Sequence, residues 1–122
     1  MADVPDLDRF NADWLAALTA KDVERLLTFY IEDCVYRDPQ TAAGLTGHDQ
    51  LRAYLTTLFA GTPAMTYTPD ELWATHDGYC GRWYCDVEGG GRLRGFDLVV
   101  LDGDRIRRNE VYVHELPAAP AS

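Results

Sequence analysis

Hydrophobic residues recur with a helical period through the first half of the chain. The spacing predicts one helix over 7–18, with Asp6 as its N-cap, and a second helix over 23–30, with Asp22 as its N-cap. A third apolar stripe at the same spacing predicts a helix over 51–59. We therefore expect the first half of the chain to be mainly helical.

The segment between the second and third helices is β-prone and ends at a proline. Cys34–Asp38 precedes Pro39, and proline lacks a backbone donor and fixes its own φ. We therefore expect Asp38 at the end of a strand or in a turn. The third helix should begin with the capping box Thr46–Asp49, where aspartate stands in place of the preferred glutamate or glutamine.

Apolar and alternating runs fill the second half of the chain. The strands that we expect cover about residues 65–75, 79–88, 92–101 and 105–115. Short turns rich in glycine and aspartate separate them, which is typical of an antiparallel meander. Three helices followed by a curved sheet form an α+β arrangement. We expect one domain over residues 1–116 and a flexible tail over 117–122.

The predicted strand 92–101 is apolar on both faces. Leu93 and Val99 share one face, and Phe96 and Leu98 share the other. A strand of this kind should be covered on both sides. The helices can cover one face, so the other needs a partner, and a second copy of the chain is the simplest candidate. The pattern thus predicts a homodimer.

Charge excludes several classes of partner. Eleven Lys and Arg stand against twenty Asp and Glu, which gives a net charge of −9. A chain this acidic binds phosphate poorly, so we expect no nucleic-acid partner and no anionic membrane partner. No apolar run reaches membrane-spanning length, and the N-terminus does not resemble a signal peptide. We expect a soluble, cytoplasmic protein.

The cysteines and histidines do not follow a metal-site pattern. The count of three cysteines argues against a disulfide framework, because that framework needs pairs. Cys80 and Cys85 are too far apart in sequence for the usual zinc spacing, and no second pair exists. His48, His76 and His114 are scattered along the chain. We therefore expect neither a metal nor another cofactor.

Asp97 is out of place in its predicted strand. Aspartate is disfavoured in strands, and a buried carboxyl group must be paired or protonated. One interpretation is an ion pair with a nearby arginine, either Arg82, Arg94 or Arg108. The other is a carboxylic acid that stays neutral and donates a hydrogen bond to an oxyanion. The pattern alone favours the ion pair.

Asp38 also has two interpretations. An aspartate before proline is common in exposed turns. At the mouth of a cavity the same residue would be suited to act as a general base. The pattern alone favours the turn. Several aromatic residues could line such a cavity or belong to an ordinary core: Trp14, Tyr30, Phe59, Tyr84 and Phe96.

Three segments resemble the SnoaL-like and ketosteroid isomerase-like branch of the nuclear transport factor 2-like superfamily. They are Leu27–Pro39, Gly44–Gly47 and the ending Asp102–Ile106 with Val111-Tyr112. The resemblance spans about residues 8–115. It implies a conical barrel in which three helices pack in a strongly curved, mostly antiparallel sheet. It also implies a pocket for a small apolar ligand and a homodimer through the convex sheet face.

The resemblance gives both aspartates a role. Asp38 falls on the general base of ketosteroid isomerases, and Asp97 falls on their oxyanion-binding acid. Trp14 stands where that family has an oxyanion-binding tyrosine, and Tyr30 matches a supporting tyrosine. Val111 fills the place of a last-strand carboxylate that epoxide hydrolases and cyclases of this fold use. Epoxide hydrolysis is therefore disfavoured.

Pattern and resemblance disagree on the strand 79–88. The apolar pattern places Trp83 and Cys85 on the buried face. The resemblance instead turns Tyr84 toward the pocket and leaves Trp83 for the dimer face. We follow the resemblance and include Tyr84, together with Asn109, among the residues that support the pocket.

These observations lead to one functional prediction and two alternatives. The prediction is an enzyme that transfers a proton, without a cofactor, next to the carbonyl of an apolar ring substrate such as a steroid or polyketide. Asp38 would take and return the proton, and protonated Asp97 would stabilise the enolate oxygen with Trp14 or Tyr30. The alternatives are a non-catalytic ligand-binding or assembly module, and a polyketide cyclase-like or hydratase activity.

Overall fold

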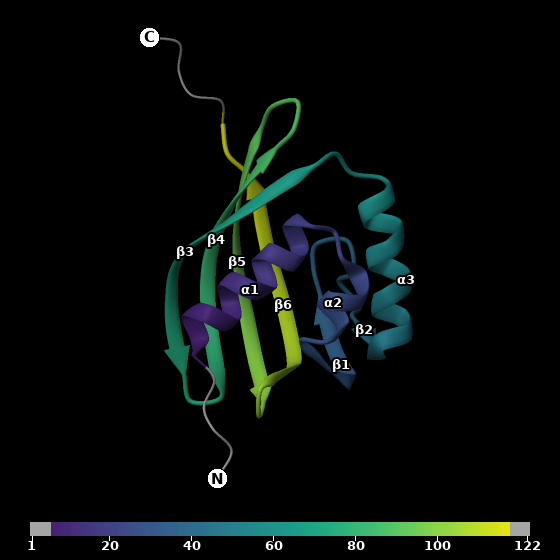
Figure 1. Ribbon diagram of the computed structural model, residues 1–122, viewed down its shortest axis with the longest axis vertical. Helices are drawn as coiled ribbons and strands as arrows, with labels where there is room; N and C mark the ends of the chain where they lie inside the picture. The colour runs from purple at the N-terminus through teal and green to yellow at the C-terminus, as the bar shows by residue number, and fades with distance from the viewer. Residues whose placement is uncertain (1–5, 118–122) are drawn as a thin grey trace.

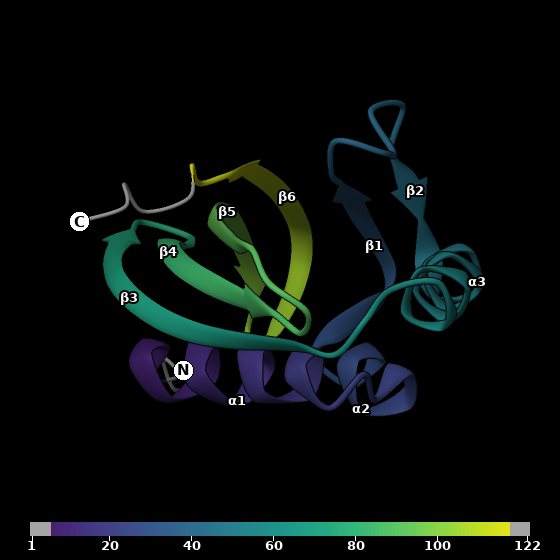
Figure 2. The same cartoon turned by 90° about the horizontal axis from the view of Figure 1, so that it is seen from above.

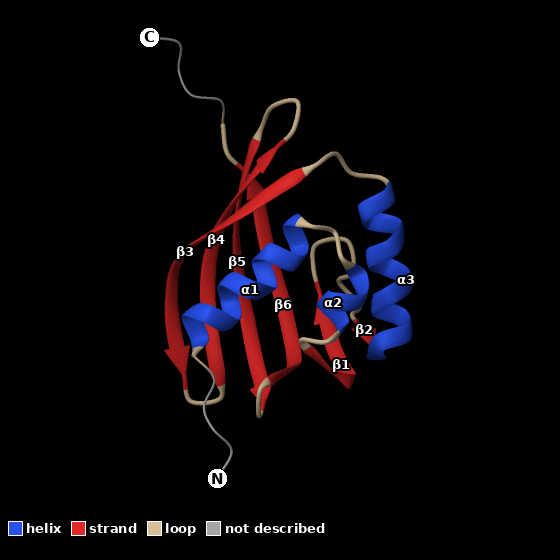
Figure 3. Cartoon of the chain, in the orientation of Figure 1, coloured by secondary structure: helices blue, strands red, loops and turns tan. Residues whose placement is uncertain are grey.

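The computed structural model describes residues 6–117, within which three helices and six strands form one domain-sized unit (Figures 1 and 3). The elements in chain order are α1 (Leu7–Thr19), α2 (Val23–Leu27), β1 (Tyr30–Arg37), β2 (Leu45–Thr46), α3 (Gly47–Ala60), β3 (Met65–Thr75), β4 (Gly78–Val87), β5 (Arg92–Asp102) and β6 (Arg105–Glu115). The four strands predicted for the second half are confirmed to within one residue at each end.

All six strands belong to one mixed sheet in the order β2-β1-β6-β5-β4-β3. Strands β3 to β6 form the expected antiparallel meander, whereas β1 pairs with β6 in parallel. The sheet is strongly curved and stays open rather than closing into a barrel. Figure 2 shows strands β3–β6 arching over α1, with α3 beside β1 and β2. The helices thus cover the concave face, as expected for the α+β cone.

The helix ends follow the predicted caps at two of three places. The carboxylates of Asp6 and Asp22 accept from backbone N–H groups at 3.2 and 3.1 Å. The capping box at α3 is wrong, because the Thr46 side chain makes no cap bond and Gln50 accepts from the Thr46 N–H instead. The second helix is also shorter than predicted, since Tyr30 begins β1.

The direction of the β4 side chains corrects the prediction made from the resemblance. Trp83 is 5% exposed and Cys85 is fully buried, so both point to the concave face. Tyr84 lies on the opposite face, where the Arg92 guanidinium stacks 4.4 Å from its ring centroid. The physical reason is strand alternation: the more apolar set of β4 packs against the helices. The apolar pattern was the better guide here.

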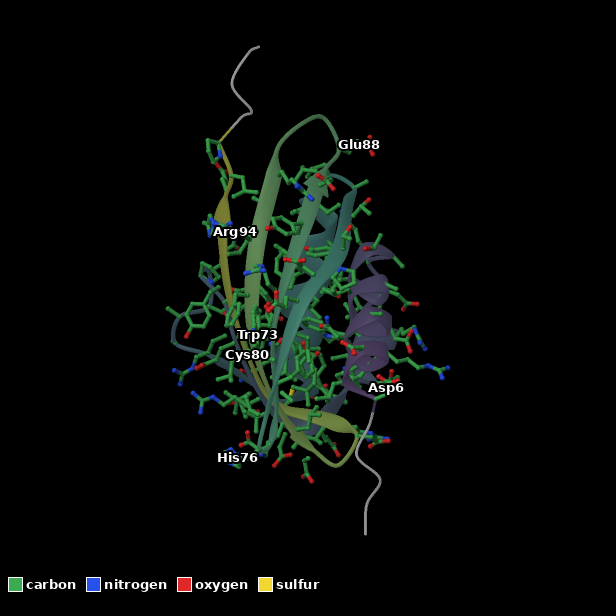
Figure 4. All side chains as sticks on the ribbon, turned by 90° about the vertical axis from the view of Figure 1, so that its left-hand side faces the viewer. Asp6, Trp73, His76, Cys80, Glu88 and Arg94 are labelled. Atoms are coloured by element: carbon green, nitrogen blue, oxygen red, sulfur yellow. The ribbon has the colours of Figure 1, made fainter. Side chains whose placement is uncertain are left out.

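The convex face of the sheet carries exposed aromatic residues. Trp73 is 39%, Phe96 40% and Tyr112 60% exposed, and the rings of Trp73 and Phe96 lie 5.8 Å apart. Figure 4 shows Trp73, Cys80 and Arg94 on the side of the sheet away from α1. This face combines the exposed aromatic residues with charged side chains such as Arg82 and Arg94, and the homodimer across it stays a prediction.

Three further expectations concern the chain as a whole. No helix within residues 6–117 is long and apolar enough to cross a membrane. The cytoplasmic location and the domain boundary at residue 116 stay predictions. Of the predicted tail, residues 118–122 lie outside the described part of the chain.

Candidate functional site

A cavity of about 240 Å³ lies between the helices and the concave face of the sheet. Its walls are mostly aromatic and aliphatic, with Trp14 from α1, Tyr54 from α3 and Trp83 from β4 among them. Two carboxyl groups also line it, those of Asp38 and Asp97. An apolar cavity with a few convergent polar groups is the usual form of a small-molecule site.

The cavity brings together most of the residues that the sequence singled out. Five of them line it directly: Trp14, Tyr30, Asp38, Asp97 and Val111. Asn109 is fully buried and supports the site through hydrogen bonds rather than as part of the cavity wall. Tyr84 lies on the convex face and is not part of the site.

Asp97 lies in the middle of β5 with its side chain on the concave face. It is 1% exposed. The Trp83 indole N–H donates to its Oδ1 at 3.1 Å, and the Asn109 side-chain amide donates to its Oδ2 at 3.3 Å. Both donors are neutral, so the carboxyl group has hydrogen bonds without a compensating cation from either partner.

The predicted ion pair between Asp97 and an arginine is wrong. Side chains alternate between the two faces of a sheet along each strand. Asp97 points to the concave face, whereas Arg94 on β5, Arg82 on β4 and Arg108 on β6 occupy positions that point to the convex face. Each has a different neighbour: Arg82 donates to Asp70 at 2.7 Å, Arg108 to Glu110 at 2.9 Å, and Arg94 contacts His114 at 3.1 Å. The structure therefore favours the second interpretation, a carboxyl group in an apolar site.

Burial raises the pKa of Asp97 to about 7, and the two hydrogen bonds from Trp83 and Asn109 oppose that rise. Desolvation disfavours the charged form of a carboxyl group, which explains the direction. Near neutral pH the group is thus present in both protonated and ionised forms. In its protonated form it can donate a hydrogen bond into the cavity.

A buried chain of hydrogen bonds fixes the surroundings of Asp97. The Tyr30 hydroxyl donates to Asn109 Oδ1 at 2.9 Å, and the Asn109 amide also donates to the Leu98 carbonyl at 3.2 Å. Burial raises the pKa of Tyr30 well above its ordinary value. Because its only proton is directed to Asn109, the Tyr30 hydroxyl is not free to donate to a ligand.

Trp14 differs from Tyr30 in this respect. Its indole N–H is buried and has no hydrogen-bond partner within residues 6–117, and its side chain lines the cavity. An unpaired buried donor costs free energy, and a ligand with an acceptor atom would relieve that cost. The Trp14 indole lies close enough to the Tyr30 hydroxyl to oppose the rise of its pKa, yet it is the donor of the two that a ligand acceptor could still engage.

Asp38 accepts five hydrogen bonds. Its Oδ2 accepts from the hydroxyls of Tyr36 at 2.9 Å and Tyr54 at 2.5 Å. Its Oδ1 accepts from the backbone N–H groups of Gln40 and Thr41 at 2.8 and 3.0 Å, and from the Thr41 hydroxyl at 3.0 Å. Asp38 is therefore both the turn residue and the cavity residue that the sequence presented as alternatives.

Sequence reasoning missed three residues of the site, namely Tyr36, Tyr54 and Trp83. Tyr36 shares a strand face with Asp38, and Tyr54 lies on the apolar stripe of α3, so each was visible as a core residue but not as a partner of Asp38. The apolar pattern of β4 placed Trp83 on the buried face, but the prediction followed the resemblance instead. Among the described residues, no group of three His, Cys, Asp or Glu side chains could hold a metal ion.

The chain matches the SnoaL-like domain family over residues 12–109. It matches no curated protein sequence. Among solved structures, a candidate SnoaL-like polyketide cyclase from Shewanella putrefaciens CN-32 is similar with a TM-score of 0.77 and 15% identity, over 91% of this chain and 81% of that one.

Two further structures share the fold. A hypothetical protein with a ketosteroid isomerase-like fold from Catenulispora acidiphila DSM 44928, in complex with trimethylamine, has a TM-score of 0.74 and 19% identity over 90% of this chain and 86% of that one. The epoxide hydrolase/cyclase-like enzyme SalBIII of salinomycin pyran ring formation has a TM-score of 0.75 and 18% identity over 93% and 95%. With the family match covering most of its length, the chain belongs to the SnoaL-like domain family.

Proposed function

We propose that the protein is an enzyme that transfers a proton next to the carbonyl of a small apolar ring substrate. One observation carries this proposal: two carboxyl groups line a single apolar cavity in opposite environments. Asp38 accepts five hydrogen bonds, whereas Asp97 is buried with a pKa near 7. Environments that separate two carboxyl groups in this way are typical of acid–base pairs in enzymes.

The geometry supports one sequence of proton transfers. The Asp38 carboxylate takes a proton from the carbon beside the carbonyl, after a tyrosine hydroxyl on Oδ2 gives way. The electron pair of the broken C–H bond moves to the carbonyl oxygen and forms an enolate. Protonated Asp97 and the indole N–H of Trp14 donate hydrogen bonds to that oxygen. Asp38 then returns the proton to a different carbon, which yields the isomer.

The size of the cavity limits the substrate. A cavity of roughly 150 Å³ accommodates benzene, and drug-sized ligands occupy roughly 300–1,000 Å³. The volume of about 240 Å³ lies between these values. We therefore propose a substrate of one or two rings rather than the four rings of a steroid. The trimethylamine held by the Catenulispora neighbour supports a small molecule as ligand for a cavity of this fold.

The test is the isomerisation of a β,γ-unsaturated cyclic ketone, followed by the absorbance of the conjugated product. Asp38→Asn should lower kcat by about 10²–10⁴, the usual contribution of a general base. Asp97→Leu should lower it by about 10²–10³, the usual contribution of an oxyanion donor. A parallel assay with a β,γ-unsaturated ketosteroid should show the weaker turnover.

The control variant is Asp33→Asn. Asp33 lies on β1, the strand that precedes Asp38, but its side chain is exposed. Its substitution should therefore leave kcat unchanged. Asn at position 38 can still accept from the turn N–H groups through its side-chain oxygen, so the loop should remain folded. Equal turnover by the wild type and Asp38→Asn would remove Asp38 from the mechanism.

A non-catalytic ligand-binding module is the second candidate, and the same Asp38 contacts favour it. A carboxylate whose oxygens are already occupied by five donors is well built to stabilise the 38–41 turn. This function predicts that cyclic ketones bind without turnover and that Asp38→Asn does not change their affinity. Tryptophan fluorescence would measure that binding, since Trp14 and Trp83 line the cavity.

We also propose that two copies of the chain pair through the convex sheet face. Exposed aromatic residues of this kind mark interaction surfaces, and Trp73, Phe96 and Tyr112 supply them. Phe96→Lys should raise the dimer dissociation constant at least about tenfold, equivalent to ~1.4 kcal/mol. Ala53→Lys, at an exposed position of α3, should not. Light scattering after size-exclusion chromatography measures both, and a monomeric wild type would contradict the proposal.

A further inference from the structure

Trp83 donates a hydrogen bond to Asp97, and the proposed mechanism assigns it no role. We propose that Trp83 is a positioning residue, which holds the Asp97 carboxyl group in place on the cavity wall and stabilises its ionised form. Gly95, which has no side chain, leaves the space in which the Trp83 ring packs. The catalytic consequence rests on the proposed function. The role itself is tested without a substrate.

Strand register explains how the indole reaches the carboxyl group. Trp83 on β4 lies directly opposite Gly95 on β5, and Asp97 follows two residues later on the same face. Diagonal neighbours across two strands are within reach of a large aromatic side chain. The indole Nε1–H extends along this diagonal and donates to Asp97 Oδ1 at 3.1 Å.

Gly95 makes room for this arrangement. A Cβ atom at position 95 would lie 2.0 Å from the Trp83 ring, which no real side chain permits. The ring therefore lies against the bare backbone of β5, and the Tyr67 ring packs edge-on against it with centroids 5.1 Å apart. With 5% exposure, Trp83 has little freedom to turn its N–H away from Asp97.

The titratable groups that surround Asp97 do not compensate the charge of its carboxylate. The titratable groups near it are Tyr30, Tyr67, Tyr79 and Cys80, and burial raises the pKa of each, so they are neutral at neutral pH. Within residues 6–117, no Lys, Arg or His side chain donates to the carboxyl group. Two neutral donors, one of them the Trp83 indole, are therefore what stabilises the carboxylate form.

The test follows the titration of the Asp97 carboxyl carbon by NMR on protein that contains isotope-labelled aspartate. In the wild type we expect a buried carboxyl signal with a midpoint near pH 7, which Asp97→Asn removes. Trp83→Phe keeps the aromatic ring and removes the donor. Its midpoint should rise by about one pH unit, the usual size of the effect of one hydrogen bond to a charged group.

Trp73→Phe is the matched control, because Trp73 lies on the convex face of the same sheet. Its midpoint should equal that of the wild type. Gly95→Ala should act like Trp83→Phe while every tryptophan is kept, since the new methyl group displaces the ring. A purely structural role for Trp83 would lower stability without moving the midpoint, so an unchanged midpoint in folded Trp83→Phe would overturn the proposal. That result would leave the turnover test of Asp38 unaffected.

Discussion

The two carboxyl groups of the cavity show how the position of a residue in the fold decides its chemistry. Asp38 is half-buried and accepts five hydrogen bonds, two of them from tyrosine hydroxyls. Asp97 is 1% exposed and accepts two, both from neutral side chains. The same side chain is thus surrounded by donors at one place, and at the other it is desolvated and can keep its proton.

The difference originates in the backbone. Asp38 follows the last residue of β1, and the turn after it directs the N–H groups of Gln40 and Thr41 toward its carboxylate. Asp97 lies inside β5 between two paired strands, where backbone donors are committed to the ladder. Only side-chain donors remain for the Asp97 carboxyl group, and the two neighbouring strands supply those of Trp83 and Asn109. A carboxyl group in a turn has backbone N–H donors nearby, whereas a carboxyl group in a central strand depends on side-chain donors from neighbouring strands.

The largest effect that we expect from this contrast is on stability as a function of pH. The folded-state pKa of Asp97 is about 7, above the ordinary 3.8, so the native state keeps a proton that the unfolded state has released. The free energy of unfolding should therefore fall as pH rises from about 4 to about 7. One pKa unit corresponds to about 1.4 kcal/mol, which makes the whole loss on the order of 4 kcal/mol.

Asp97→Asn removes this contribution and is the variant that measures it. Urea unfolding of the wild type and the variant at about pH 5 and pH 8, at a fixed protein concentration, gives the two slopes. The variant should gain stability relative to the wild type at the higher pH. Parallel slopes for the two proteins would show that Asp97 ionises as readily in the native state as in the unfolded chain.

The sequence predicted the parts of the fold that depend on local pattern. The bounds of β3 to β6 follow from short turns between apolar runs, and the caps at Asp6 and Asp22 follow from side chains that act within one turn. The parallel pairing of β1 with β6 depends on contacts between distant segments. No local pattern carries that information, and the two-residue strand β2 is too short to show one.

The site was predictable as a set of residues but not as a network. The resemblance located Asp38 and Asp97, because both stand in recognisable segments. It misplaced Tyr84 and Trp83, since at this point the apolar alternation of β4 decides which side chains face the helices. The tyrosine partners of Asp38 arise from packing α3 against β1, so only the folded chain brings Tyr54 to that carboxylate.

A smaller effect on stability is expected from a substitution beside Asp38. It lowers the free energy of unfolding, whereas Asp97→Asn raises it relative to the wild type at high pH. Tyr54→Phe removes a hydroxyl that donates to Asp38 at 2.5 Å and leaves the ring in place. Loss of a hydrogen bond to a charged group should lower the free energy of unfolding by about 1–2 kcal/mol, less than the effect at Asp97 because the site is only half-buried. Urea unfolding at neutral pH measures this change.

A double-mutant cycle with Asp38→Asn separates the hydrogen bond from the packing of the ring. If the carboxylate is what Tyr54 stabilises, Tyr54→Phe should cost less than half as much in the Asp38→Asn background as in the wild type. Tyr84→Phe on the convex face should cost little in either background, because its ring contacts Arg92 rather than a cavity carboxylate. An equal cost of Tyr54→Phe in both backgrounds would mean that the tyrosine contributes through packing alone. The turn donors from Gln40 and Thr41 would then be the ones that stabilise the carboxylate, and the contrast with Asp97 would rest on burial instead.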